Sequence, residues 1–240
     1  MLNNVFSKIR GPVVVKTIDP LYKEAKETLK IITIDADKMI NYIEQIENTL
    51  KKLSQLSMQF GDDINQFYSD APEEKQEKAK TNFNFIKNFF ALTNGFFIPR
   101  TEFNVISLIT QYRDETNQLN ELKKNVKLLR TEYDKSRAMV QYLSIDPDVD
   151  KNKMNQALDK MEIDNQNYSQ INIQFVNSVN KLKEKRKATF EITFKNFLCL
   201  SSQYMMQIFT EIQKYRITFP PETFDRNYIL KDKSTNNKKK

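Results

Sequence analysis

Residues 20–67 read PLYKEAKETLKIITIDADKMINYIEQIENTLKKLSQLSMQFGDDINQF and carry a sustained heptad stripe. Apolar or small residues recur at alternating steps of four and three, which is typical of helices that pack side by side. The stripe consists of Ala25, Leu29, Ile32, Ala36, Met39, Ile43, Ile46, Leu50, Leu53, Ser57, Phe60, Ile64 and Phe67. Asp19 suits the N-cap and Pro20 the first helical position. The pattern predicts a long amphipathic helix that begins at Pro20.

Further helical segments are predicted after this one. A second segment is expected over residues 72–94, with Gly95 as its C-cap and the chain turning back before Pro99. Heptad stripes then predict helices over residues 100–143 and 150–215. The aspartates between them, at positions 146, 148 and 150, fit a turn and an N-cap better than a calcium loop, because the required glycine and glutamate are absent.

The expected helices are too long for a compact fold. At about 1.5 Å per residue the last would be about 100 Å long and the first about 70 Å, whereas a globule of this size has a radius of gyration of roughly 18 Å. In residues 83–109 and 190–209, apolar residues also lie beside the heptad stripe and not only on it. A single three-helix seam would leave these flanks exposed, which favours a dimer. The predicted fold is all-α, an elongated and kinked three-helix antiparallel coiled-coil bundle.

The composition excludes most catalytic chemistry. The chain has no histidine, a single cysteine and three glycines. It therefore cannot form a Ser-His-Asp triad, a zinc or iron-sulfur site of the usual ligands, or an internal disulfide. Three scattered glycines cannot form a phosphate-binding loop or a dinucleotide fingerprint. We expect no enzymatic activity, no cofactor and no metal, and we expect Cys199 to be a buried core residue.

Length and hydropathy favour a soluble protein. The 240 residues are 39% apolar and 29% charged. No window approaches the roughly 18 consecutive apolar residues of a spanning helix, and the apolar run 13–15 is too short for a signal peptide. We therefore expect a cytoplasmic protein.

The net charge of +7 is concentrated at the two ends of the chain. Three cations and no acid lie in residues 1–18, and five lysines against one aspartate lie in residues 231–240. Residues 19–230 are neutral on balance, so any basic surface there must come from uneven distribution. We expect a flexible, amphipathic segment over residues 1–18, a helical domain over residues 19–219, and a disordered basic tail over residues 220–240.

Four segments resemble motifs of the BAR (Bin/amphiphysin/Rvs) family, and of its N-BAR branch in particular. Residues 16–22, KTIDPLY, look like the K-T-x-D-x-x-F/Y entry into the first helix of that family. Residues 128–137, LLRTEYDKSR, are similar to the R-x-x-[FY]-D-x-x-[KR] segment of its second helix. Residues 97–99, FIP, lie where the family has N-F-I-x-P, although one residue and the Asn are missing. The last predicted helix resembles the aromatic third helix of the family at Phe175, Phe190, Phe194, Phe197 and the pair Gln203-Tyr204.

The resemblance implies a crescent-shaped dimer that binds anionic phospholipid membranes and senses or induces their curvature. It implies a role in endocytosis or in cortical membrane and actin remodelling, with the protein peripheral at membranes. The partner would be a second copy or another BAR protein, and actin or endocytic factors could join. We expect no nucleic-acid partner. We expect no SH3 domain after the third helix, as in the BAR-only members of the family.

Membrane binding of this kind depends on cations. Each Lys or Arg brought close to anionic lipid contributes roughly 1 kcal/mol. The candidates form two runs on the second and third helices and a pair at the turn between them: Lys123, Lys124, Lys127, Arg130, Lys135 and Arg137, then Lys181, Lys183, Lys185, Arg186 and Lys187, and the turn residues Lys151 and Lys153. The alternative for each run is a solvated helix face.

The first ten residues form an amphipathic candidate. Leu2, Val5, Phe6 and Ile9 share one helical face, with the cations Lys8 and Arg10 beside them. A helix this short would form only on insertion between lipid headgroups, where burial of four apolar side chains is worth on the order of 6–10 kcal/mol. We expect a wedge that helps to generate curvature, and the alternative is a frayed terminus.

Two other functions remain open. The first is a structural coiled-coil scaffold or tether that binds protein partners without remodelling membranes. The second is nucleic-acid binding through the basic ends, which is less well supported because the aromatic residues lie on the core stripes rather than between the lysines.

Overall fold

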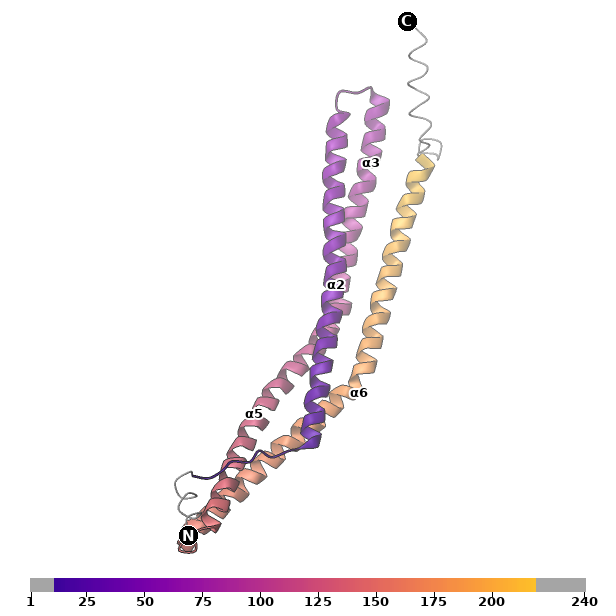
Figure 1. Ribbon diagram of the computed structural model, residues 1–240. Helices are drawn as coiled ribbons and strands as arrows, with labels where there is room; N and C mark the ends of the chain where they lie inside the picture. Colours follow the sequence, from indigo (N-terminus) through magenta and orange to yellow (C-terminus); the bar gives the residue numbers. More distant parts are fainter. Residues whose placement is uncertain (1–10, 219–240) are drawn as a thin grey trace, which may run out of the picture. The chain divides into compact units, whose positions relative to one another are not determined.

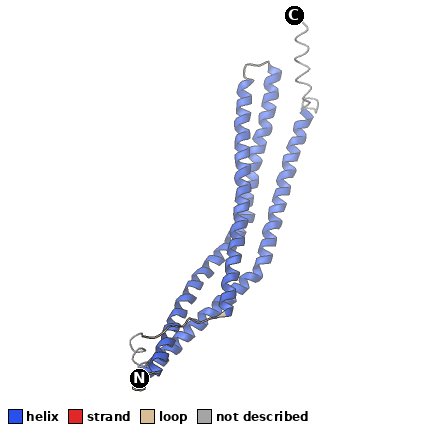
Figure 2. Ribbon diagram, viewed as in Figure 1, coloured by secondary structure: helices blue, strands red, loops and turns tan. Residues whose placement is uncertain are grey.

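The computed structural model describes residues 11–218, and every regular element in that range is helical (Figure 2). The elements are α2 (Pro20–Phe67), α3 (Glu73–Ala91), η1 (Leu92–Phe97), α4 (Ile98–Thr101), η2 (Glu102–Ile106), α5 (Ser107–Ser144) and α6 (Lys151–Thr218). Figure 1 labels the four longest of them, α2, α3, α5 and α6. The predicted all-α class is confirmed, since the described chain consists of three long helical runs joined by two turns. No helix among residues 11–218 is long and apolar enough to cross a membrane.

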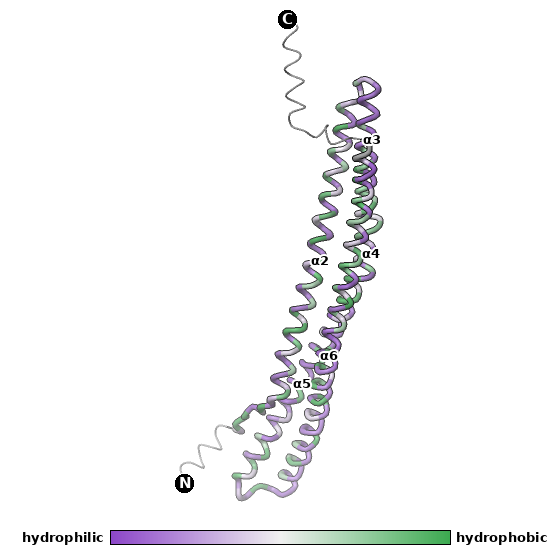
Figure 3. The backbone as a smooth tube through the Cα atoms, turned by 90° about the vertical axis from the view of Figure 1, so that its right-hand side faces the viewer, coloured by the Kyte–Doolittle hydropathy of each residue, from purple (hydrophilic) through white to green (hydrophobic). Residues whose placement is uncertain are grey.

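The helices contribute to two compact units. Unit 1 comprises the chain up to Met39 and the segment Ile109–Phe190, and unit 2 comprises Ile40–Leu108 and the chain from Glu191 onward. Hydrophilic and hydrophobic residues alternate along each helix (Figure 3). Each helix can therefore bury one side within its unit and leave the other exposed.

The first helix begins where the sequence predicts. The backbone N–H of Tyr22 donates to Oδ1 of Asp19 at 2.9 Å, which confirms Asp19 as the N-cap and Pro20 as the first helical residue. Within unit 1 the predicted stripe is buried at Ala25, Leu29 and Ile32. The heptad pattern therefore identifies the inner face of this part of α2.

Aromatic residues connect the three helices of unit 1. Tyr22 of α2 packs on Phe175 of α6 with ring centroids 5.5 Å apart. Tyr112 of α5 donates its hydroxyl hydrogen bond to the Leu182 carbonyl of α6 at 3.0 Å. Burial raises the pKa of Tyr112 to about 12, so this hydroxyl remains a donor at physiological pH.

The turn between α5 and α6 has the predicted structural role. The backbone N–H of Asn152 donates to Oδ1 of Asp150 at 3.1 Å, and the N–H of Asp148 donates to Oδ1 of Asp146 at 3.3 Å. Asp150 thus caps α6, and Asp146 stabilises the turn before it.

Gly95 does not end a helix, and the prediction that the chain turns back before Pro99 is wrong. Gly95 lies inside η1 and has no positive φ, so the chain stays helical from Glu73 to Ser144. The π turns η1 and η2 lie on either side of α4, and Pro99, near the start of α4, lacks the N–H that a regular helical turn would use. Between α2 and α5 the chain instead turns back between Phe67 and Glu73.

The buried face of α2 changes position in unit 2. The sequence places Ile46, Leu53 and Phe60 on the core stripe, but these side chains are exposed. The buried positions are Ile40, Ile43, Glu47, Ser54 and Gly61. In this part of α2 the stripe is therefore confirmed as a core assignment at Ile43 and wrong at Ile46, Leu53 and Phe60.

Gly61 allows α2 and α3 to approach closely. A Cβ atom at this position would lie 2.9 Å from Cδ2 of Phe83 and 3.0 Å from Cδ1 of Ile86. The helix continues unbroken to Phe67. Glycine is thus required here for side-chain space and not for a helix break.

Candidate functional site

All the candidate cations within the described residues lie in unit 1. The first run, from Lys123 to Arg137, is on α5, and the second, from Lys181 to Lys187, is on α6. Lys151 and Lys153 are exposed in the first turn of α6. The fold thus gathers in one unit three groups that are separate in the sequence.

Some of these cations are engaged in contacts within the unit. Arg130 is buried, with its guanidinium 5.3 Å from the ring centroid of Tyr22. Arg186 forms an ion pair with Asp35, and Lys185 forms one with Glu115 at 3.2 Å. These three side chains join α5 or α6 to a neighbouring helix, so they contribute to the stability of unit 1.

Most of the remaining cations are exposed and available to a ligand. Among the described residues, no carboxylate forms an ion pair with the following exposed lysines: Lys127, Lys135, Lys151, Lys153, Lys181, Lys183 and Lys187. Lys124 is also exposed but pairs with Glu121 at 2.7 Å. Exposed pairs of that kind contribute little and can exchange partners.

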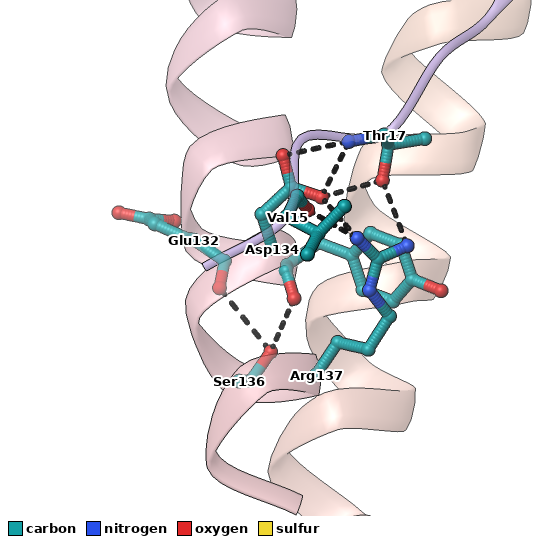
Figure 4. A network of polar contacts seen from close by, with 7 residues as sticks. Val15, Thr17, Glu132, Asp134, Ser136 and Arg137 are labelled. Carbon is teal, nitrogen blue, oxygen red and sulfur yellow. Dashed lines mark hydrogen bonds and ion pairs between the residues drawn. The ribbon is translucent and has the colours of Figure 1, made fainter. Parts of the chain in front are cut away.

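The segment before α2 is fastened to α5 by Asp134 (Figure 4). The backbone N–H of Thr17 donates to both carboxylate oxygens of Asp134, at 3.0 and 3.1 Å, and the Thr17 hydroxyl donates to Oδ1. Arg137 donates to the Val15 carbonyl, to Oγ1 of Thr17 at 3.3 Å and to Asp134 at 3.2 Å. The two segments that most resemble the BAR family therefore bind each other directly.

Asp19 connects the same segment to α6. Besides capping α2, its Oδ2 accepts hydrogen bonds from the Tyr168 hydroxyl at 3.2 Å and from Nδ2 of Asn172. Burial, together with the negative charge of Asp19, raises the pKa of Tyr168 to about 12. The start of α2 is thus held on both α5 and α6, which fixes the position of the lysines that follow.

A groove of about 700 Å³ opens beside these contacts. It is lined by side chains from the segment before α2, the first turns of α2 and the middle of α5: Lys16, Thr17, Ile18, Asp19, Tyr22, Lys23, Lys26, Lys123, Lys124, Lys127 and Arg130. Lys16, Lys23 and Lys26 are not among the predicted membrane-binding cations. The spacing of Lys23 and Lys26 places them on one helical face, but only the fold brings that face opposite α5.

Unit 2 is held together by a buried polar contact and by packed aromatic rings. The hydroxyl of Thr93 in η1 lies 2.7 Å from that of Tyr204 in α6. Phe97 packs on Tyr204 and on Phe197, with centroid distances of 4.7 and 6.4 Å. The aromatic residues predicted for the third helix therefore include core residues of unit 2.

Unit 2 also exposes two apolar stripes. On α2, Ile46, Leu53, Phe60 and Phe67 repeat every seven residues, and Phe60 is 63% exposed. On α6 the exposed residues are Ile192, Phe194, Leu198, Met205, Met206, Phe209 and Ile212. The predicted exposed flank over residues 190–209 is confirmed in this respect, whereas the flank over residues 83–109 is largely covered because Phe97, Ile98 and Val105 are buried.

Glu47 is an unusual buried acid in unit 2. Its side chain is on α2, the residue is only 7% exposed, and Oε1 has no hydrogen-bond partner among the described residues. Burial, together with the charges of Glu102 and Glu44, raises the pKa of Glu47 to about 7. The sequence does not predict the burial of Glu47, because the residue lies next to Ile46 of the predicted stripe and not on the stripe itself.

Two other predictions concern the ends and the cysteine. Lys8 and Arg10, together with the predicted wedge residues Leu2, Val5, Phe6 and Ile9, lie outside the described residues. The prediction that Cys199 is buried is wrong, since its side chain is exposed on α6 next to the exposed Leu198. The inner face of α6 at this level is instead formed by Leu200 and Tyr204.

The comparison with known proteins identifies the fold. No protein-family model and no curated protein matches the sequence. A BAR protein from Galdieria sulphuraria is similar in structure with a TM-score of 0.61 at 13% identity, covering 88% of this chain and 100% of that one. The amphiphysin BAR domain from Drosophila is similar with a TM-score of 0.63 at 12% identity, covering 88% and 97%. The chain therefore has the fold of a BAR domain.

Proposed function

We propose that this protein binds anionic membranes peripherally, as a BAR dimer that senses or induces membrane curvature. The observation that carries the proposal is the BAR-domain fold, which agrees with the sequence motifs at residues 16–22 and 128–137. A role in endocytosis or in cortical membrane and actin remodelling belongs to the same proposal.

The charges of unit 1 support membrane binding. Apart from Lys124 and Lys185, the exposed candidate lysines on α5 and α6 form no ion pair with a carboxylate among the described residues, so lipid phosphates and carboxylates would not have to displace one there. At roughly 1 kcal/mol for each cation near the surface, several must act together. A unit that gathers them from two helices meets that requirement.

The apolar stripes of unit 2 support the dimer. Large side chains that recur every seven residues on α2, and a similar set on α6, are what a helix of a partner would cover. We propose a second copy of this chain, or a related BAR protein, as the occupant. The wedge formed by residues 1–10 would add insertion to this electrostatic binding.

Sedimentation with vesicles tests the proposal. We expect the full chain to pellet with phosphatidylserine vesicles at 50 mM salt, to pellet much less at 500 mM salt, and not to pellet with neutral phosphatidylcholine vesicles, because salt screens surface charge. The variant Lys181→Gln/Lys183→Gln/Lys187→Gln, in unit 1, should pellet several-fold less. Its control, Lys51→Gln/Lys52→Gln/Lys75→Gln, removes three exposed lysines of unit 2 and should pellet like the wild type. Pelleting that ignores salt and lipid charge would contradict the proposal.

Electron microscopy of the same vesicles tests curvature. We expect tubules with the full chain, and fewer tubules but unchanged dimerisation when residues 1–10 are deleted. An equal loss of tubules and dimers would remove the wedge from the proposal.

The second candidate is a coiled-coil scaffold or tether. The exposed stripes of unit 2 favour it as well, since they fit partner helices whether or not a membrane is present. A stable dimer that neither pellets with anionic vesicles nor deforms them would select this function.

A further inference from the structure

A second groove, the α3–α6 groove, lies within unit 2. Its volume of about 510 Å³ is within the range of about 300–1,000 Å³ that is typical of ligand pockets. It is lined by residues of α3, η1 and α6: Asn88, Ala91, Leu92, Phe96, Gln207, Thr210 and Glu211. None of the predicted membrane-binding cations within residues 11–218 lines it. The α3–α6 groove is therefore separate from the basic surface of unit 1.

The wall of the α3–α6 groove is largely apolar but includes one oxygen that lacks a partner. Ala91, Leu92 and Phe96 supply hydrocarbon and an aromatic ring. Oε1 of Gln207 is buried and has no hydrogen-bond partner among the described residues. Buried polar atoms are nearly always paired, so this oxygen indicates a donor that residues 11–218 do not supply.

Glu211 gives the α3–α6 groove a negative charge. Its carboxylate accepts hydrogen bonds from Nζ of Lys214 at 2.6 Å and from Nδ2 of Asn88 at 2.9 Å. These bonds lower the pKa of Glu211, so the group is ionised at neutral pH. The ammonium group of Lys214 is on an exposed side chain, and an exposed pair of this kind contributes little. The groove thus suits a ligand that combines an apolar group, a hydrogen-bond donor and a positive charge.

The α3–α6 groove and the exposed apolar stripe lie on different sides of α6. Met205, Phe209 and Ile212 are exposed and follow steps of four and three, so they share one face of the helix. Gln207 and Glu211 each come two residues after a member of this stripe, which places them about 200° around the helix from it. A partner helix that packs on the stripe would therefore face away from Gln207 and Glu211.

A segment of suitable chemistry follows α6 in the same chain. Residues 222–230 read ETFDRNYIL, and they lie outside the described residues. Phe224, Arg226 and Tyr228 are spaced two apart, so an extended backbone would present them on one side, with Asp225 and Asn227 on the other. The first side offers two aromatic rings, a guanidinium and a hydroxyl donor.

The chain between α6 and this segment is long enough to reach the α3–α6 groove. Gln207 lies about 16 Å along the helix from Thr218, the end of α6, at 1.5 Å per residue. An extended chain at about 3.3 Å per residue spans about 20 Å from Thr218 to Phe224 and about 33 Å to Tyr228. The prolines at positions 220 and 221 lack the N–H that a longer helix would need. A tether this short also gives the segment a high effective concentration at the groove.

We propose that the α3–α6 groove is an internal docking site for residues 222–230 of the same chain. The segment returns along α6, so Arg226 pairs with Glu211 before the Tyr228 hydroxyl donates to Oε1 of Gln207. The two aromatic rings pack on the apolar wall. Docking holds the five lysines of residues 231–240 beside α3 and α6, and so adds positive charge to unit 2, where the described residues include none of the predicted membrane-binding cations.

Hydrogen exchange of the full chain, followed by mass spectrometry, tests the docking. We expect the backbone amides of residues 222–230 to exchange at least about tenfold more slowly than an unstructured peptide of the same sequence. The groove variant Ala91→Lys/Thr210→Lys should restore fast exchange. Its control, Gln55→Lys/Gln59→Lys, alters two exposed residues of α2 in unit 2 with the same change in charge, and should keep the slow exchange. Circular dichroism checks that both variants keep their helices.

Changes in the segment test which of its sides is bound. Phe224→Ser/Tyr228→Ser removes both rings and should abolish the slow exchange. Asp225→Ser/Asn227→Ser alters the opposite side and should retain it. These four residues follow α6, so neither change affects the helices of unit 2 directly.

A mixture distinguishes docking within one chain from docking on a second copy. The groove variant has an intact segment, and the variant Phe224→Ser/Tyr228→Ser has an intact groove. We expect fast exchange in residues 222–230 of the groove variant even after the two proteins are refolded together from urea. Slow exchange in this mixture would place the segment in the groove of a second copy and would overturn the proposal.

Three further results would overturn the docking site. They are exchange of residues 222–230 at the rate of the unstructured peptide in the unmodified chain, an equal effect of the groove variant and its control, and an equal effect of the two changes in the segment. No membrane is present in these measurements, so they remain decisive even if the vesicle experiments fail.

Discussion

At the scale of single residues, the carboxylate of Asp134 makes several polar contacts at once. Its carboxylate accepts three hydrogen bonds from Thr17 and one ionic contact from Arg137. We expect Asp134→Ala to reduce the free energy of unfolding by about 2–3 kcal/mol, since it leaves the backbone N–H of Thr17 without its acceptor and the partly buried guanidinium of Arg137 without its carboxylate. Urea denaturation measures this change.

The same variant has a local effect that global stability does not report. Trypsin should cut after Lys16 faster in Asp134→Ala, because the segment around Thr17 is no longer fastened to α5. Asp159→Ala changes an exposed aspartate on α6 and serves as the control. An unchanged cleavage rate would mean that Arg137 alone holds the segment.

Glu47 predicts an unusual dependence of stability on pH. Its pKa of about 7 in the folded state lies above the ordinary value of 4.5, so the folded protein binds more protons than the unfolded chain between these values. The contribution of this group to stability is therefore largest below about pH 5 and declines as the pH rises through 7. Removing the ionisable group should make stability less dependent on pH in this window.

Melting temperatures at pH 5.5 and pH 8 measure this effect. We expect the melting temperature of Glu47→Gln to change less between the two pH values than that of the wild type, and to be the higher of the two at pH 8. Glu24→Gln alters an exposed glutamate of α2 and should follow the wild type. Parallel pH profiles for all three proteins would refute the role of Glu47.

At the scale of the helix, the two interior glycines predict opposite responses to alanine. Gly95 lies in η1 with no atom within 4 Å of an added Cβ, so Gly95→Ala should raise the free energy of unfolding by about 0.5–1 kcal/mol through helix propensity. Gly61→Ala gains the same propensity but places Cβ 2.9 Å from the Phe83 ring. We expect Gly61→Ala to be less stable than Gly95→Ala by at least about 1 kcal/mol in urea denaturation. Equal stabilisation by both changes would show that α2 and α3 are less tightly packed.

The helices also show how far a heptad pattern can be followed. In unit 1 the stripe from Ala25 to Ile32 is buried as predicted, because α5 and α6 cover one constant side of α2. In unit 2 the same stripe at Leu53 and Phe60 is exposed. Periodicity finds an apolar face, but it does not tell which of two adjacent faces the chain itself covers.

At the scale of the whole molecule, the exposed stripes predict self-association through unit 2. We expect Leu198→Glu to weaken dimerisation at least tenfold in sedimentation equilibrium, because it would bury a charge in an apolar interface. Ile173→Glu alters a similarly exposed apolar residue of unit 1 and should leave the dimer intact. A monomeric wild type at micromolar concentration, or an equal effect of both variants, would contradict this assignment.

The sequence by itself determined the helical class, the start of α2 at Pro20, the capped turn at Asp150 and the resemblance to the BAR family. These features depend on neighbours a few residues away, or on motifs whose residues are contiguous. The prediction from the sequence was wrong at Gly95, because a glycine with open space around it can either cap a helix or lie within a π turn. The π turn is the one that goes with the burial of Phe97 and Ile98.

Only the tertiary structure decided which charged residues work together. It joined Thr17 to Asp134, buried Arg130 against Tyr22, and placed Lys23 and Lys26 across a groove from Lys127. The physical reason is that charge acts through space, so its effect depends on distances between segments that the chain order does not contain. Helix propensity and capping act along the chain, and for that reason the sequence alone could predict them.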